Sequence, residues 1–331
     1  MIDNADCLIN DDVRKFINFE LSNQYMLLLR NCDGLNVSDK SFKVLKFDNN
    51  RINTRRGVVY SMDVFTIKKN GKSFMLNIDN FEEMTKKRFP YYQYGVDKKL
   101  KCYAICPECG NPIHIINLYG TEMMQNKTGI ITTYAKHTRR RVTGFDFWNP
   151  CDKEDCSLYN PTPLGNTEIK HNDEYSEELK ELIENNKRTI FKNIREVVCI
   201  NLSTRIINRL YDSFMNSNAY TYKAVTKYNI PYAMLYYQQS ISLYGQYIVE
   251  GILGDLVLNQ VNEKSRFFKV ENTGEIVKKV TGYKTINMIF KQFKDTGNEK
   301  TITMEIYETD EKDHIYIILK EKISLKSYIY S

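Results

Sequence analysis

The stretch Cys106-Pro107-Glu108-Cys109-Gly110 contains two cysteines three positions apart, with a proline and a glycine that allow a tight knuckle. In such a turn two thiolates and two backbone amides face one point. Zinc requires four soft or borderline ligands in a tetrahedron, and a second close pair of cysteines follows later in the chain. The sequence therefore predicts a structural zinc site with the ligands Cys106, Cys109, Cys151 and Cys156.

Other ligand sets remain open. His137 competes for the fourth position, in which case either Cys151 or Cys156 is left as a free thiol. Cys102 is a further candidate because it lies four residues before Cys106. The alternative to a metal is a group of buried cysteines that behave as small hydrophobic residues. Four available ligands favour a closed, structural site over a catalytic site, which keeps one position for water.

The flanking residues predict the local fold. A strand over 101–105 leads into the knuckle, and Ile113, Ile115 and Ile116 form the strand that leaves it. Together they predict a zinc-ribbon-like β unit. His114 lies inside the outgoing strand, where a histidine more often packs or hydrogen-bonds than binds metal.

The N-terminus and the apolar segments predict a cytoplasmic protein that makes no membrane contact. Residues 1–6 are polar and acidic, without the basic and apolar regions of a secretion signal. The longest apolar stretch, 247–258, is interrupted by Glu250 and Asp255 and is too short to span a bilayer. In a reducing compartment paired cysteines indicate metal binding more than disulfides.

Composition and pattern predict an α+β protein. The chain has 331 residues, of which 42% are hydrophobic and 27% charged, so it is globular and long enough for two or three domains. We expect a β-rich N-terminal α+β region (1–100), a zinc-binding module (101–160), a linker (161–175), a helical domain (176–262) and a C-terminal antiparallel β-meander (263–331).

Local patterns support these boundaries. The first 40 residues have a partial helical stripe, and Asn70-Gly71 predicts a hairpin turn between the strand 58–68 and the alternating Phe74, Leu76 and Ile78. Ser176, followed by acidic residues, predicts a helix N-cap. Near the C-terminus an acidic turn separates two alternating runs, which are Ile302, Met304 and Ile306, and then Ile315, Ile317 and Leu319.

Basic and aromatic residues indicate nucleic-acid binding. The net charge is only +6, but positive charge gathers in the first half of the chain. Lys136, Arg139, Arg140 and Arg141 flank His137, and tyrosines at 91, 92, 94 and 134 could stack on bases. The alternative is that these charges are only solvated surface residues.

Residues 224–236 resemble the short helix-turn-helix motif of Psq-type and transposase-type DNA-binding proteins. Ala224 is small where two helices cross, Asn229 suits the left-handed turn, and Pro231 opens the next helix. The resemblance, which covers about 223–240, implies a recognition helix from Pro231 to about Ser240 in the major groove. It implies base or phosphate contacts from Tyr232, Ala233, Tyr236 and Gln239, with help from Lys223 and Lys227.

The zinc segment, about 102–156, resembles the zinc-binding region of competence-protein CoiA-like proteins. The resemblance lies in the knuckle, in the later Tyr134-Ala135-Lys136-His137 and in the cysteine that follows. Relatives of that family include nuclease domains. Their signature, an aspartate followed by Glu-x-Lys on adjacent strands, does not occur in the second half of this chain.

The sequence therefore predicts a zinc-stabilised nucleic-acid-binding regulator or accessory factor. Frequent Lys, Asn, Ile and Tyr indicate an AT-rich coding sequence, as in low-GC bacteria, their phages or some large DNA viruses. The regulator is therefore expected in a phage, virus or mobile-element setting. Two alternatives are a metal-dependent nuclease and a protein-interaction subunit of a larger complex that would bind a protein partner. Phosphate-loop, dinucleotide-binding and nucleophile-elbow motifs do not occur.

Overall fold

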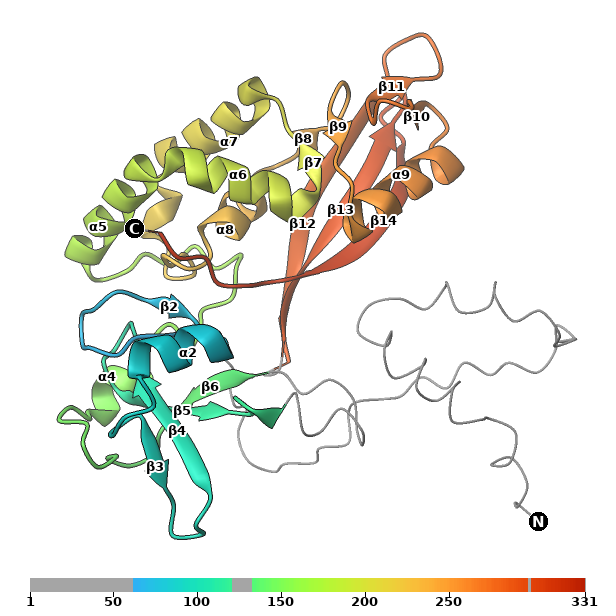
Figure 1. Cartoon of the computed structure of the whole chain (residues 1–331). Coiled ribbons are helices and arrows are strands. Elements are labelled where there is room, and N and C mark those ends of the chain that lie inside the picture. The colour runs from blue at the N-terminus through green and yellow to red at the C-terminus, as the bar shows by residue number, and fades with distance from the viewer. Residues whose placement is uncertain (1–61, 121–132, 297–298, 331) are drawn as a thin grey trace, which may run out of the picture.

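The chain folds into two units, each with a hydrophobic core of its own (Figure 1). The computed structural model describes residues 62–120, 133–296 and 299–330. These residues form a mixed α+β structure, as predicted, and every pair of named strands is antiparallel. The predicted N-terminal helical segment and the start of the predicted strand 58–68 lie outside the described residues.

The first unit is built around a four-stranded sheet with the order β3-β4-β5-β6. A short hairpin and the helix α2 pack with this sheet around Phe65, Phe81 and Ile113, which are fully buried. The strands predicted on both sides of the knuckle are confirmed as β4 and β5. The elements of this unit are β1 (Val64–Phe65), β2 (Phe74–Met75), α2 (Ile78–Thr85), β3 (Tyr92–Tyr94), β4 (Leu100–Ile105), β5 (Pro112–Ile116), β6 (Tyr134–His137) and α4 (Pro150–Glu154).

The hairpin β1–β2 is shorter than the sequence predicted. The tight turn has Lys69 and Asn70 at its centre, since Gly71 N donates to Lys68 O at 2.9 Å and only Asn70 has a positive φ, at 58°. The prediction of an Asn70-Gly71 turn was therefore wrong by one residue. Ile78, predicted to continue the strand, opens α2 instead, because the Asn77 side chain caps that helix by accepting a hydrogen bond from Asn80 N.

The second unit combines a helical layer with a four-stranded sheet, β14-β13-β12-β8. The predicted helical domain and the predicted C-terminal β region share one hydrophobic core, since buried residues from α5 to α9 and from β12 to β14 form one cluster. The elements are α5 (Asp173–Asn185), α6 (Lys187–Val198), β7 (Ile200–Asn201), α7 (Thr204–Asn216), the 3-10 helix η1 (Ala219–Thr221), α8 (Ile230–Tyr236), β8 (Ile241–Ser242), β9 (Tyr247–Ile248), α9 (Ile252–Lys264), β10 (Phe268–Val270), β11 (Ile276–Lys278), β12 (Thr285–Asp295), β13 (Lys300–Thr309) and β14 (Ile315–Ser324).

Helix α5 begins earlier than predicted. Its N-cap is Asn172, whose side chain accepts from Tyr175 N, while the predicted cap Ser176 is buried within the first turn. The last residues of the predicted linker 161–175 therefore belong to the helix.

The predicted β-meander is present as β12, β13 and β14, but its second apolar run has an unexpected orientation. The pairing changes register between Ile306↔Leu319 and Tyr307↔Ile317, which leaves Ile318 as an extra residue. Such a bulge interrupts the alternation of faces. Ile318 and Leu319 are buried, whereas the predicted core residues Ile315 and Ile317 are 63% and 43% exposed.

The helix-turn-helix expected at 223–240 does not form. Residues 223–229 form turns in place of a first helix, and α8 ends at Tyr236 instead of about Ser240. Asn229 is not left-handed, with φ −119° and ψ 13°; its side chain instead accepts from Thr226 N and donates to Ala224 O. Tyr232 and Ala233 are buried, because α8 packs into the core of the second unit.

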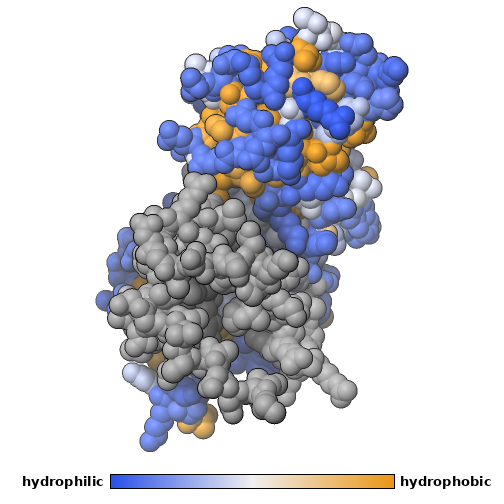
Figure 2. Space-filling model, turned by 90° about the vertical axis from the view of Figure 1, so that its right-hand side faces the viewer, coloured by the Kyte–Doolittle hydropathy of each residue, from blue (hydrophilic) through white to orange (hydrophobic). Residues whose placement is uncertain are grey.

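The face of the second unit that Figure 2 shows has a mixed surface. Hydrophilic side chains cover much of it, with hydrophobic residues visible between them (Figure 2). Within the described ranges, every helix is too short or too polar to cross a lipid bilayer.

Candidate metal centre

Four side chains of the first unit converge on one point next to the knuckle. They are Cys106 and Cys109 of the knuckle, His137 at the end of β6, and Cys156 just after α4, and their ligand atoms all lie within 4.8 Å of one another. Cys106, Cys156 and His137 are buried and Cys109 is half-buried. The structure thus brings together three of the four predicted cysteines and the alternative fourth ligand.

Cys151 lies outside this group. It is on α4, and its thiol is exposed. Asn149 caps that short helix by accepting from Cys151 N at 3.0 Å. The group that could hold a metal ion thus consists of three of the predicted cysteines and the alternative ligand His137, while Cys151 lies outside it.

Backbone hydrogen bonds hold the knuckle in shape. Gly110 N donates to Cys106 O at 2.9 Å, and Cys106 N donates to Asn111 O at 2.8 Å. Gly110 has φ +72°, a left-handed conformation that favours glycine, and a Cβ there would meet the Lys69 side chain at 3.0 Å. The role predicted for Gly110 is confirmed.

The electrostatics of the group favour a thiolate at its centre. Hydrogen bonds from Cys106 and Cys156, with further ones from His137 and Asn111, hold the pKa of Cys109 far below its ordinary range. Burial raises the pKa of Cys106, so this thiol keeps its proton when no cation is present. A cation would replace these protons, because metal ligands must be deprotonated.

The donor set and its spacing fit zinc. A tetrahedron with zinc–sulfur bonds of about 2.3 Å has sulfur–sulfur edges of about 3.8 Å, and slightly shorter edges to nitrogen. The Cys106 and Cys156 sulfurs are 3.6 Å apart, and Cys109 Sγ lies 3.3 Å from His137 Nε2. Two of the donor–donor distances thus match the edges of such a tetrahedron, and all four donors lie within 4.8 Å of one another.

Asn111 supports the centre from outside and was missed by the sequence reasoning. Its side-chain Nδ2 donates to Cys109 Sγ at 3.3 Å, while its Oδ1 accepts from Asn149 N at 2.7 Å. It therefore ties the knuckle to the segment that carries Cys156. Its place directly after the knuckle was the only signal in the sequence.

The other candidate ligands lie elsewhere. Cys102 points into the core of the first unit from β4, and burial raises its pKa to about 12. His114 of β5 stacks on Tyr103 with ring centroids 5.1 Å apart. Neither residue belongs to the group of four donors, in agreement with the prediction that His114 packs within the strand.

The predicted basic residues next to His137 lie on the surface. Arg139, Arg140 and Arg141 are exposed, and Lys136 is half-buried on β6. The loop that follows is fastened to the opposite edge of the sheet, where Gln93 Nε2 donates to Thr143 O at 2.9 Å. The arginines therefore lie on a loop that is held at both ends.

The remaining predicted nucleic-acid residues do not join this surface. Lys223 pairs with Glu168, and Lys227 pairs with Glu108 at 3.1 Å. The Tyr232 hydroxyl donates to Ser324 O at 3.3 Å and accepts from Lys326 N at 3.2 Å, so its contacts are within the protein. Tyr236 is half-buried, and Gln239 is exposed beyond the end of α8.

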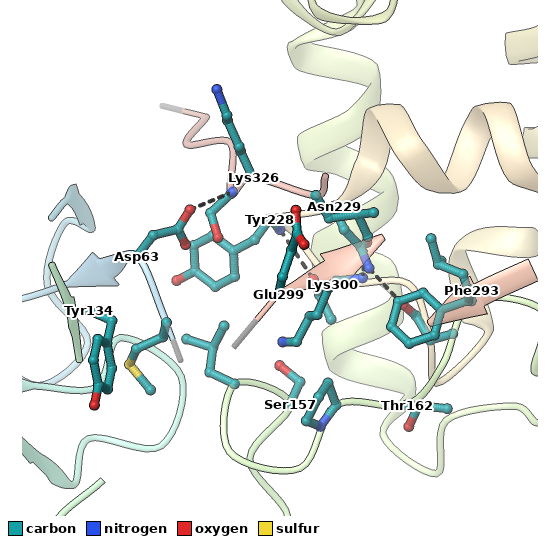
Figure 3. Close-up of a pocket in the computed structure, with 18 of the residues that line it drawn as sticks. Asp63, Tyr134, Ser157, Thr162, Tyr228, Asn229, Phe293, Glu299, Lys300 and Lys326 are labelled. Carbon is teal, nitrogen blue, oxygen red and sulfur yellow. Dashed lines mark hydrogen bonds between the residues drawn. The ribbon is translucent and has the colours of Figure 1, made fainter. Parts of the chain in front are cut away.

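A cavity of about 240 Å³ lies between the two units (Figure 3). Asp63 and Tyr134 line it from the first unit, and Asn229, Phe293 and Lys300 from the second. One wall is closed by Ser327 N, which donates to Asp63 Oδ2 at 2.9 Å. The cavity does not reach the four metal ligands.

Comparisons with protein-family models, with curated proteins and with solved structures found no match to this chain. The resemblances to CoiA-like zinc regions and to Psq-type motifs are therefore not supported from outside the sequence.

Proposed function

We propose that this chain is a zinc-stabilised nucleic-acid-binding regulator or accessory factor, in which the metal holds a basic loop in place. The observation that carries the proposal is the exposed run Arg139–Arg141, which begins two residues after the ligand His137. Zinc would be held by Cys106, Cys109, His137 and Cys156 and would supply structural stability. The knuckle and its two strands are then a zinc-ribbon-like module.

The loop suits phosphate recognition for two reasons. Arginine offers a planar fork of donors that matches phosphate oxygens, and it keeps its charge at any physiological pH. The loop is also preorganised, because His137 fixes one end and Gln93 the other. Gly144 allows this close approach, since it has φ +81° and a Cβ there would meet the Phe89 ring at 2.6 Å. A loop that is already ordered loses less entropy when it binds.

A salt titration tests the proposal. Binding of the full chain to labelled DNA and RNA is measured by fluorescence anisotropy at several salt concentrations. Replacing Arg139, Arg140 and Arg141 by glutamine should weaken binding and lower the slope of log K against log salt by about 2 to 3.

The matched control removes the same charge from the second unit. Lys192, Arg205 and Arg209 are exposed on α6 and α7, and their replacement by glutamine should leave the slope unchanged. An unchanged slope in the Arg139–Arg141 variant, or an equal loss in both variants, would overturn the role of the loop.

A further inference from the structure

The sheet of the first unit has one buried and one partly open face. Side chains alternate along each strand, and Cys102, Ala104, Ile113, Ile115 and Ala135 point into the core. Their neighbours in the sequence point to the opposite face, which we call the outer face.

A row of chemically distinctive side chains crosses this outer face. Tyr103 of β4 pairs with His114 of β5, and His114 pairs with Lys136 of β6, so the three side chains lie side by side on adjacent strands. Each of them is half-buried. The rings of Tyr103 and His114 are stacked, with 5.1 Å between their centroids and 28° between their planes. The face therefore presents two nearly parallel flat rings.

Positive charge lies on both sides of the stack. Lys136 is next to His114 across the strands, and Lys101 is the next outward residue of β4 before Tyr103. Burial and the charges of these two lysines lower the pKa of His114 to about 4, so the ring is neutral at pH 7. Lys101 also contacts Asp97 at 3.4 Å, and about a third of its side chain is exposed.

The arginine loop joins the two edge strands of the same sheet. The loop leaves β6 at one edge of the sheet and accepts a hydrogen bond from Gln93 of β3 at the other. Nearby, Phe145 meets the ring of Tyr91, the residue before β3, edge-on at 5.8 Å. Basic residues thus occur on β4, on β6 and on the loop between the two edges. Flat rings between cationic groups are the combination by which proteins bind single strands, with bases on the rings and phosphates on the cations.

We infer that the outer face of the sheet binds single-stranded nucleic acid, with a base stacked beside Tyr103 and His114 and the backbone held by Lys101, Lys136 and the arginine loop. This inference rests on the proposed function and names its substrate class. A duplex offers the same phosphates, but its bases are stacked on one another, so it cannot use the rings.

The test compares one single-stranded oligonucleotide, as DNA and as RNA, with the matching duplex at constant salt. Tyr103→Thr removes the ring but keeps a residue that is favourable in a β-strand. It should weaken binding to the single strand about tenfold, while the affinity for the duplex changes less than about twofold. Tyr103→Phe keeps the ring and should bind like the wild type. Zinc content and thermal unfolding confirm that each variant is folded, and His114→Val replaces Tyr103→Thr if the latter does not fold.

The outcomes separate the two proposals. If the wild type binds neither single strands nor duplexes, both proposals fail. If the arginine variant loses binding while Tyr103→Thr and His114→Val bind single strands normally, only the outer-face site is overturned. If Tyr103→Thr lost affinity equally for single strands and for duplexes, the outer-face site would also be overturned.

Discussion

The carboxylate of Glu108 lies 3.1 Å from the ammonium group of Lys227 and so joins the cysteine knuckle to the second unit. Glu108 stands between the ligands Cys106 and Cys109, while Lys227 belongs to the turn before α8. The Glu108 side chain is only 12% exposed and also accepts a hydrogen bond from Ser157 at 3.3 Å. A residue between two of the candidate metal ligands is therefore part of the contact between the two units.

Replacing Lys227 by methionine should destabilise the protein. It would leave a mostly buried carboxylate without its cation, and we expect the free energy of unfolding to fall by about 1 to 3 kcal/mol. Lys223→Met is the control, because Lys223 pairs with Glu168, whose side chain is 55% exposed, and such pairs contribute about 0 to 1 kcal/mol. Urea unfolding measures the stability of both variants. An equal fall in the free energy of unfolding would contradict a special role for the Glu108–Lys227 pair.

Single substitutions should separate Cys151 from the metal ligands. The wild type is expected to hold about one zinc ion per chain, because the four donors form one closed site. Cys151→Ser should keep that zinc, since the thiol is exposed and outside the group. Cys156→Ser and His137→Gln should lose most of it. The zinc content of each variant is measured after dialysis. Loss of zinc from Cys151→Ser together with retention of zinc by His137→Gln would support the four-cysteine site instead.

The two halves of this site differ in how well the sequence could predict them. The knuckle is local, because Pro107 and Gly110 determine how Cys106 and Cys109 approach each other. The other two ligands depend on where β6 and α4 are placed by the fold. The competition among Cys151, Cys156 and His137 was therefore visible in the sequence, but its outcome depends on tertiary structure.

The same limit explains the errors in the second unit. The alternating residues of β13 and β14 predicted the hairpin correctly, yet one extra residue, Ile318, reversed the faces of Ile315 and Ile317. The consecutive apolar residues Ile317, Ile318 and Leu319 fit either phase of the alternation, so the pattern does not identify the extra residue. At 224–236 the small residues, the asparagine and the proline predicted two helices, but a side-chain-capped turn meets the same local preferences. The capped turn forms instead of a first helix, and α8 is buried in the core.

Acid should weaken the folded state through His114. Its pKa is lowered to about 4, first by burial and then by Lys136 and Lys101, while the unfolded chain has the ordinary value near 6.5. Between about pH 6.5 and 4 the unfolded state thus binds a proton that the folded state does not, and the free energy of unfolding falls as the pH falls.

His114→Asn removes this contribution and serves as the comparison. Because the ring is partly exposed, we expect the wild type to lose about 1 to 2 kcal/mol more than the variant between pH 7 and pH 4.5. Denaturant unfolding of both proteins with zinc present at each pH measures the difference, since acid also affects the metal ligands equally in both. Parallel pH profiles would show that His114 does not titrate in this way.

The burial of Tyr232 gives a direct test of whether α8 reads nucleic acid. Its hydroxyl bonds Ser324 O and Lys326 N, which fixes the end of β14 against α8. Tyr232→Phe removes both bonds and should lower the free energy of unfolding by about 1 kcal/mol without changing nucleic-acid affinity. Gln239→Ala changes an exposed side chain and should alter neither quantity. If α8 were a recognition helix, both substitutions would weaken binding to duplex DNA at unchanged zinc content, because both residues would then face the groove.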